Sequence, residues 1–332
     1  MKHSIAQIGD LRLANGQTLP QAQIAYVAHG KLAADGRNAI LVTHGYTSGP
    51  SMLSTEHLTA EGSWAPVLGP GKALDTDRFF IVCSNMLGSS FGSTGPSSTN
   101  PATGKPWGPD FPAIHLRDIV AAQRALLAHL GVKHLHAVLG PSYGGFQALQ
   151  WALESPEMVG ACGVIVSGFT SPGLTADSAR AKFADHPDWH GGWHYEHPGM
   201  RARMLELRMQ TLRQYGLDKL YEDRLPNPAD RQAAMLKNAQ PWADHFDPNS
   251  MIVLARAAQD FDVRARLPEL RARLLLAVCN TDVIFPPDAA TQAALAQVPA
   301  ETKYLEIDSP YGHMAPGLSW SQLEPAVRWL IR

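Results

Sequence analysis

The stretch that decides the fold is LHAVLGPSYGG, residues 135–145. It begins with an apolar run of strand length, and residues 140–144 match the pattern Gly-x-Ser-x-Gly directly before a helical segment. Small residues two positions before and after the serine allow a tight strand-to-helix turn, which pushes the serine hydroxyl out of the sheet. The N-terminus of the following helix favours developing negative charge. The stretch therefore predicts that Ser142 is a nucleophile.

A second copy of the pattern, GSSFG at residues 88–92, shows that the five letters alone do not identify the site. Ser90 is followed by a loop rich in serine, threonine, glycine and proline, not by a helix. Because the strand-turn-helix context is missing, we interpret Ser90 as a turn serine that hydrogen-bonds local backbone.

Apolar runs of strand length recur along the chain, and helical patterns separate several of them. The runs cover residues 39–43, 79–83, 135–139, 163–166, 274–278 and 304–307. Alternating strands and helices favour a mostly parallel sheet that is covered on both faces. Together with the turn at Ser142, this pattern predicts an α/β-hydrolase fold, in which helices flank a mostly parallel central sheet.

The segment 170–262 interrupts this alternation, because it lacks clear strand runs and is rich in Arg, Gln, Met, Trp and His. We interpret it as a helical cap inserted into a core domain formed by residues 1–169 and 263–332. Helices are expected at residues 201–214, 228–237 and 250–259, after a loop at residues 185–200 that is rich in Gly, Pro, His and Trp.

The composition is that of an ordinary globular protein. The chain has 332 residues, 45% of them hydrophobic, and a formal net charge of −2. Its basic residues are scattered, so we expect neither nucleic acid nor a membrane surface as a partner. The start of the chain lacks the apolar segment of a secretion signal, which leads us to expect a cytoplasmic protein. The three cysteines fall in or beside apolar runs and are expected to be core thiols.

A serine hydroxyl becomes a good nucleophile only when an imidazole takes its proton, and a carboxylate must orient that imidazole. In this fold the chain order is Ser, then Asp or Glu, then His. Asp282 follows the apolar run at 274–278, and His313 follows the run at 304–307. Both therefore fall in loops at the same sheet edge as Ser142. Asp308 is the competing carboxylate, although its position favours a role in capping the turn before His313.

Residues 44–47, with the sequence HGYT, follow the first core strand. A glycine-containing turn there can direct a backbone N–H toward the oxyanion of a tetrahedral intermediate, beside the N–H of the residue after the nucleophile. We therefore expect Tyr46 and Tyr143 to be the oxyanion-hole donors through their backbones. The alternative is a simple turn that ends a strand.

The expected cap contains four closely spaced histidines, His186, His190, His194 and His197. Such spacing can indicate a metal site. Pro187, Gly191 and Gly192 interrupt any helix that would align the four rings, so we expect no bound metal. The alternative interpretation is that these histidines, with Trp189 and Trp193, line or cover an acyl-binding pocket.

Beyond these motifs, several loop strings resemble the homoserine O-acetyltransferase family, a branch of the α/β-hydrolase superfamily, over nearly the whole chain. The matching strings are residues 16–20 (GQTLP), 24–26 (IAY), 92–98 (GSTGPSS), 100–106 (NPATGKP), 110–112 (DFP), 117–118 (RD), 147–151 (QALQW), 285–287 (FPP) and 312–313 (GH). The resemblance implies a triad of Ser142, Asp282 and His313, and it also implies a homodimer.

Two departures fall where that family is thought to bind its amino-acid substrate. The family usually has Asp directly after the catalytic His, where this chain has Met314. It also carries an Arg in the cap that holds the substrate carboxylate, where this chain has Thr211. Arg213 or Arg208 could replace that Arg. The residues expected to contact substrate are Thr47, Thr211, Arg213 and Met314.

These departures weaken the case for homoserine, because a zwitterion without charge partners is costly to desolvate. The sequence therefore favours hydrolysis of small carboxylic esters through an acyl-serine. The alternative is an O-acetyltransferase that moves acetyl from acetyl-CoA to homoserine or another small alcohol. No cofactor is expected, and acetyl-CoA would be a substrate. A non-catalytic binding protein is a third possibility, against which the complete triad argues.

Overall fold

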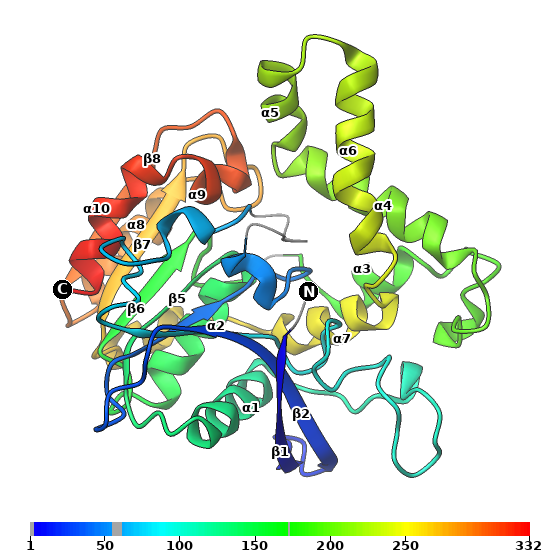
Figure 1. The fold of residues 1–332 in the computed structure, drawn as a ribbon, viewed down its shortest axis with the longest axis horizontal. Helices are drawn as coiled ribbons and strands as arrows, with labels where there is room; N and C mark the ends of the chain where they lie inside the picture. The colour runs from blue at the N-terminus through cyan, green and yellow to red at the C-terminus, as the bar shows by residue number, and fades with distance from the viewer. Residues whose placement is uncertain (1–2, 55–61, 172) are drawn as a thin grey trace.

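The computed structural model describes residues 3–54, 62–171 and 173–332; Pro172 of the expected cap lies outside the described residues. Within this part of the chain, one eight-stranded sheet has the order β1-β2-β4-β3-β5-β6-β7-β8. Its strands are β1 (Ser4–Arg12), β2 (Thr18–His29), β3 (Ala39–Thr43), β4 (Phe80–Ser84), β5 (Leu135–Pro141), β6 (Ala161–Ile165), β7 (Arg273–Cys279) and β8 (Thr302–Ile307). Figure 1 shows this sheet running through the middle of the molecule.

The six strands from β4 to β8 pair in parallel, and each corresponds to an apolar run in the sequence. Alternate residues of these strands enter two different cores. In β3, Leu41 packs with the apolar cluster on one face, while Ile40 and Val42 pack with the cluster on the other. Because both faces are covered, every residue of β3 is buried, and the period-2 polar pattern of an exposed strand disappears.

The hairpin of β1 and β2 forms one edge of the sheet and pairs antiparallel, through β2, with β4. Neither strand corresponds to an apolar run in the sequence, because their buried residues are interrupted by exposed polar ones. In Figure 1 the hairpin is the long blue ribbon below the rest of the sheet.

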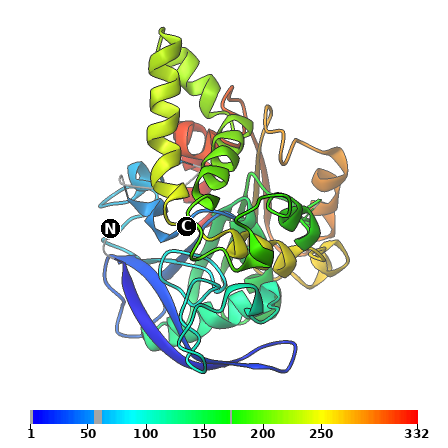
Figure 2. The same cartoon turned by 90° about the vertical axis from the view of Figure 1, so that its right-hand side faces the viewer.

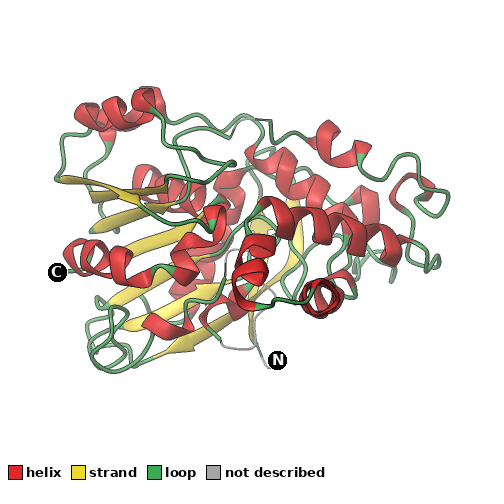
Figure 3. Ribbon diagram, turned by 90° about the horizontal axis from the view of Figure 1, so that it is seen from above, coloured by secondary structure: helices red, strands yellow, loops and turns green. Residues whose placement is uncertain are grey.

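Helices cover both faces of the sheet, as Figure 3 shows, so the predicted α/β-hydrolase fold is confirmed. Helices α1 (Leu116–His129) and α2 (Tyr143–Glu154) bury their apolar sides in one core cluster, whereas α10 (Trp320–Leu330) belongs to the other. Two shorter helices are α8 (Ala289–Ala294) and α9 (Ala315–Leu318). Short 3-10 helices lie at Pro50–Leu53, Ala65–Val67, Gly108–Asp110, His190–Gly192, Arg264–Glu269, Leu295–Gln297 and Gly312–Met314.

The described residues between β6 and β7 form five α-helices, in the segment 170–262 that we call the cap. They are α3 (Ala176–Ala181), α4 (Met200–Gln214), α5 (Leu217–Arg224), α6 (Pro228–Ala243) and α7 (Pro248–Ala258). An isolated antiparallel bridge pairs Thr170 with Asp262 at the base of the segment. Figures 1 and 2 show α4, α5 and α6 projecting from the molecule, whereas α7 lies close to α2.

The structure also tests the expectations for the cysteines and for membrane-spanning helices. Cys83, Cys162 and Cys279 are all buried free thiols, as expected for core cysteines. In the part of the chain that the structure describes, no helix combines the length and apolar character needed to cross a bilayer.

Candidate active site

Ser142 occupies the strained turn between β5 and α2. Its φ of 56° and ψ of −127° lie outside the regions that an L-residue normally adopts. The flanking glycines explain why the chain can form this turn. A Cβ on Gly140 would lie 2.0 Å from the carbonyl oxygen of Thr43, and a Cβ on Gly144 would lie 2.3 Å from the same atom. The pattern Gly-x-Ser-x-Gly is therefore needed because β5 and α2 pass against the end of β3.

Hydrogen bonds on both sides of the serine hold the turn in place. The Ser142 N–H donates to the carbonyl of Ile165 at 2.9 Å, and the Ser167 hydroxyl donates to the Ser142 carbonyl at 2.7 Å. Ser142 itself is only 4% exposed. Ile165 is the last residue of the neighbouring strand β6, and Ser167 comes two residues later. The sheet therefore positions the backbone of Ser142.

His313 and Asp282 form a buried pair. The Nδ1 atom of His313 lies 2.8 Å from Oδ2 of Asp282, and both side chains have no solvent exposure. The other carboxylate oxygen, Oδ1, accepts the backbone N–H of Ile284 at 2.8 Å. Since the carboxylate is held at both oxygens, it fixes the orientation of the imidazole, which is the role of the acid in a catalytic triad.

The second ring nitrogen of His313, Nε2, is buried and has no hydrogen-bond partner among the described residues. The imidazole packs against Tyr215 at 4.4 Å and Phe285 at 6.0 Å between ring centroids, and both of these residues line the same cavity as Ser142. Asp308, the competing carboxylate, is exposed and accepts a hydrogen bond from the amide of Asn280. The structure thus pairs His313 with Asp282.

The turn at residues 44–47 is tied to the core by side-chain hydrogen bonds. The His44 carbonyl accepts the amide of Gln147 at 3.0 Å, and His44 Nε2 lies 3.1 Å from the side-chain oxygen of Asn85. Gln147 belongs to α2, the helix that follows the nucleophile. The loop that carries Tyr46 is therefore fixed relative to the helix that begins at Tyr143.

The side chains of Tyr46 and Tyr143 anchor both expected oxyanion donors to the cap. The Tyr46 hydroxyl donates to the carbonyl of Met251, and the Tyr143 hydroxyl donates to the carbonyl of Leu254 at 3.0 Å. Met251 and Leu254 lie one turn apart on α7. Burial raises the pKa of both phenols, so they remain neutral donors.

Ser90 has a structural role in this arrangement. Its hydroxyl accepts the backbone N–H of Asp247 at 2.9 Å, directly before α7. Asp247 in turn accepts the N–H of Asn249 at 2.7 Å as the N-cap of that helix. The second Gly-x-Ser-x-Gly therefore belongs to a loop that holds the start of α7.

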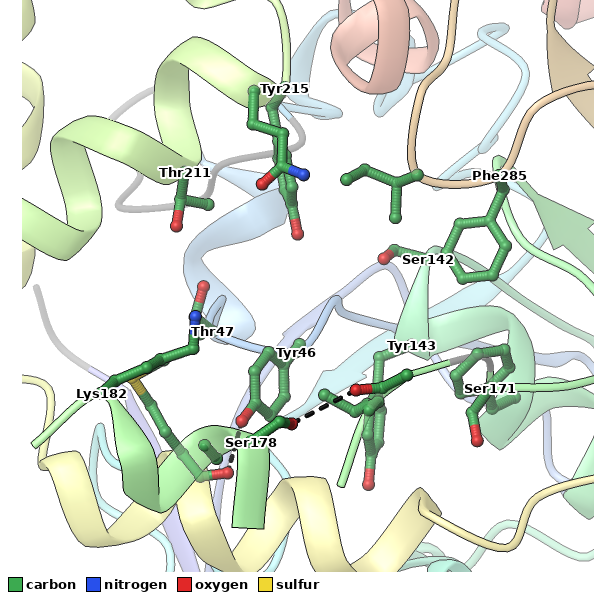
Figure 4. Close-up of a pocket in the computed structure, with 17 residues that line it drawn as sticks. Tyr46, Thr47, Ser142, Tyr143, Ser171, Ser178, Lys182, Thr211, Tyr215 and Phe285 are labelled. Carbon is green, nitrogen blue, oxygen red and sulfur yellow. Dashed lines mark hydrogen bonds between the residues drawn. The ribbon is translucent and has the colours of Figure 1, made fainter. Parts of the chain in front are cut away.

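A cavity of about 380 Å³ extends from Ser142 to the cap, as Figure 4 shows. Core residues form one side, and residues of α3, α4 and α7 form the other. The described lining residues are Tyr46, Thr47, Ser142, Tyr143, Phe146, Ser171, Gly173, Leu174, Ser178, Ala179, Lys182, Thr211, Gln214, Tyr215, Met251, Ile284 and Phe285. The mixture of apolar walls and a few polar groups is typical of a small-molecule site.

The four residues expected to contact substrate fall into two groups. Thr47 and Thr211 line the cavity. Arg213 is exposed on α4, and Met314 is buried in a cluster with Leu212 and other cap residues. Neither Arg213 nor Met314 is among the described residues that line the cavity. The position after the histidine therefore contributes to the contact between cap and core.

Arg208 is the cation that the structure places next to the turn at residues 44–47. It is 1% exposed, donates to the Thr47 hydroxyl at 3.3 Å, and lies over the Trp242 ring at 4.8 Å. Trp242 also donates to the Thr47 carbonyl at 2.8 Å. Arg208 was expected only as an alternative to Arg213. The buried apolar residues Met204, Leu207 and Leu212 of α4 lie on the same helix face as Arg208 and are the sequence signal that places it inside.

None of the four cap histidines is among the described residues that line the cavity. His194 pairs with Asp247 at 3.3 Å, and Trp193 packs over Gly108, so this loop covers the loop at residues 107–110. The same loop brings Asp188, His190 and His197 together, with their potential ligand atoms within 4.8 Å of one another. None of these three residues is among the described residues that line the cavity.

The chain is similar to proteins of known family and structure. Residues 38–317 match the model of the alpha/beta hydrolase fold family. The chain is 38% identical to a homoserine O-acetyltransferase of Moorella thermoacetica, over 97% of this chain and 93% of that protein. It is 34% identical to a homoserine O-succinyltransferase of Bordetella pertussis, over 96% of this chain and 85% of that protein.

A solved structure gives the same picture. The crystal structure of a homoserine O-acetyltransferase from Bacillus anthracis superposes with a TM-score of 0.86 and 25% sequence identity. The superposition covers 100% of this chain and 97% of the other. The similarity therefore includes the segment between β6 and β7 as well as the sheet.

Proposed function

The chain belongs to the homoserine O-acetyltransferase-like family of the α/β-hydrolase superfamily, and we propose that it transfers a short acyl group from an acyl-CoA to a small alcohol. The observation that carries the proposal is the cavity between Ser142 and the cap, whose walls combine apolar side chains with a few polar groups. Relatives named for transfer to homoserine support this activity better than the ester hydrolysis that the sequence favoured.

In the first half of the proposed reaction, His313 Nε2 takes the proton of the Ser142 hydroxyl as its oxygen attacks the thioester carbonyl. The backbone N–H groups of Tyr46 and Tyr143 stabilise the negative oxygen of the tetrahedral intermediate. The C–S bond then breaks, the imidazolium returns its proton to the departing thiolate, and an acyl-serine remains. Asp282 stabilises the imidazolium through its bond to Nδ1.

In the second half, the acceptor alcohol gives its proton to His313 as its oxygen attacks the acyl-serine. Collapse of the intermediate restores Ser142 and releases the new ester. Water competes for the same step, so transfer requires that the acceptor be held closer to the acyl group than water. Leu174, Met251 and Phe285 on the cavity walls favour this, because apolar side chains exclude water from the acyl group.

Met314 gives a specific reason to keep hydrolysis as a second candidate. The side chain directly after the histidine is apolar and packs in the cluster of Leu212 and Tyr215. It therefore offers no charge to the ammonium group of an amino-acid acceptor. This favours an acceptor without an ammonium group, or water itself.

The experiment that separates these activities measures the loss of acetyl-CoA and the formation of ester with homoserine, with uncharged short alcohols, and without an acceptor. Ser142→Ala serves as the inactive control, and p-nitrophenyl acetate reports hydrolysis. Acceptor-dependent loss of acetyl-CoA with stoichiometric ester supports transfer. Serine-dependent hydrolysis that no acceptor accelerates would replace transfer by the second candidate.

A further inference from the structure

The loop between α3 and α4 gathers three metal-binding side chains outside the cavity. One ligand atom from each of Asp188, His190 and His197 lies within 4.8 Å of the other two. The rings of His190 and His197 are 3.9 Å apart between centroids, at 31° to each other. Three groups that come from positions 188, 190 and 197 therefore converge on one point without a helix to align them.

The donor set is one that suits a borderline transition metal. Two imidazoles and a carboxylate are common ligands of Zn²⁺, which binds nitrogen and oxygen at about 2.0–2.2 Å. Ligand atoms of a tetrahedral Zn²⁺ are consequently about 3.3 Å apart. Small rotations about the side-chain bonds would bring the three groups from their observed separation to that spacing.

The surrounding structure holds the ligands in place. The Gly199 N–H donates to Oδ2 of Asp188 at 2.9 Å, and the carboxylate keeps lone pairs for a metal. The amide of Asn249 donates to the Gly192 carbonyl at 2.9 Å and ties the loop to α7. A hydrogen bond to a ligand, such as the one to Asp188, orients that ligand and raises metal affinity.

His190 has an unusual backbone that brings its ring toward His197. Its φ is 46°, and Gly191 and Gly192 that follow also have positive φ. A histidine with this backbone is uncommon, because its Cβ crowds the following carbonyl oxygen. With this backbone, the exposed ring of His190 lies over the ring of the half-buried His197.

We propose that Asp188, His190 and His197 bind one divalent transition-metal ion of the Zn²⁺ class, with water completing the coordination. The site is separate from Ser142 and is independent of the proposed acyl transfer. Because the loop joins α3 to α4, and both helices line the cavity, the metal would stabilise the cap rather than take part in the chemistry.

The test is a calorimetric titration of the chelator-treated full chain with Zn²⁺, together with the visible absorption spectrum after addition of Co²⁺. His190→Asn and His197→Gln remove the imidazoles, and Asn keeps the left-handed backbone at position 190 accessible. His245→Gln removes an exposed histidine elsewhere in the cap and serves as the matched control. Circular dichroism verifies that each variant is folded.

We expect one Zn²⁺ per chain, an increase in the thermal unfolding midpoint on Zn²⁺ addition, and at least a tenfold loss of affinity in both ligand variants. The His245→Gln protein should bind like wild type. Absence of stoichiometric binding to wild type would overturn the proposal, and so would unchanged binding by folded His190→Asn and His197→Gln proteins.

Discussion

The rings of Tyr46 and Tyr143 stack with their centroids 5.9 Å apart, and their hydroxyls reach carbonyls one turn apart on α7. These two residues carry the backbone N–H groups that we expect to form the oxyanion hole. The stacked pair therefore connects the position of a cap helix to the position of the oxyanion donors. An enzyme that must close a cavity before reacting can use such a connection to align the donors.

Removal of the two hydroxyls should disturb the oxyanion hole without changing cavity shape. We predict that Tyr46→Phe and Tyr143→Phe each cost about 1 kcal/mol of stability, because each leaves a buried carbonyl without its hydroxyl donor. We also predict that kcat falls more than KM rises. Steady-state kinetics and urea unfolding measure both effects. Tyr26 is a half-buried tyrosine of β2 that is not among the described residues lining the cavity, so Tyr26→Phe is the control. Equal kinetic losses in all three proteins would contradict the oxyanion explanation.

Asp282 should matter through the orientation of His313. Asp282→Asn keeps the shape of the side chain but removes the carboxylate that accepts the Nδ1 proton. We predict a loss of kcat on the order of a thousandfold or more. Asp308→Asn changes a carboxylate on the neighbouring loop and should leave kcat within about a factor of two. A larger loss in Asp308→Asn than in Asp282→Asn would exchange the two assignments.

Arg208 should stabilise the contact between the cap and the turn at residues 44–47. Arg208→Met preserves much of the apolar volume but removes the hydrogen bond to Thr47 and the cation over Trp242. We predict a loss of about 2 kcal/mol, since hydrogen bonds of buried charged groups are strong. The exposed Arg213→Met should change stability by less than about 0.5 kcal/mol. Chemical denaturation of both variants makes the comparison.

Buried thiols should make the protein less stable in alkali. Burial raises the pKa of Cys83 and of Cys162 above the ordinary thiol value of 9.0. Above that value the unfolded chain loses protons that the folded chain keeps, so the free energy of unfolding falls as pH rises. Each thiol can contribute a slope of up to about 1.4 kcal/mol per pH unit. Urea unfolding between pH 8 and 10 should show a shallower decline in Cys83→Ala/Cys162→Ala than in wild type; identical slopes would contradict this origin.

The buried elements of the fold could be predicted from the sequence because parallel strands are apolar on both faces. The run at residues 39–43 coincides with β3, and the run at 274–278 lies inside β7. The hairpin of β1 and β2 could not be predicted in this way. An edge hairpin exposes part of each strand, so its sequence shows no continuous apolar run.

Some residues of the candidate site could likewise be predicted from the sequence, and others could not. Ser142 could be found because a close approach to Thr43 imposes small residues at fixed spacing. The contacts of Arg208 could not be predicted, because they depend on which face of α4 packs against Thr47 and Trp242. Both of these residues are far from Arg208 in the sequence. The grouping of Asp188 with two histidines depends likewise on left-handed backbone at His190, which a residue pattern does not encode.

The central claim is that an acyl group passes through Ser142. The most direct measurement incubates the protein with acetyl-CoA in the absence of acceptor, quenches the reaction rapidly, and locates the acetyl group by peptide mass spectrometry. We predict acetylation of the peptide that contains Ser142, loss of the label when an acceptor alcohol is added, and unchanged labelling in Ser90→Ala. Turnover without an acetylated Ser142, or acetyl found on Ser90 instead, would contradict it.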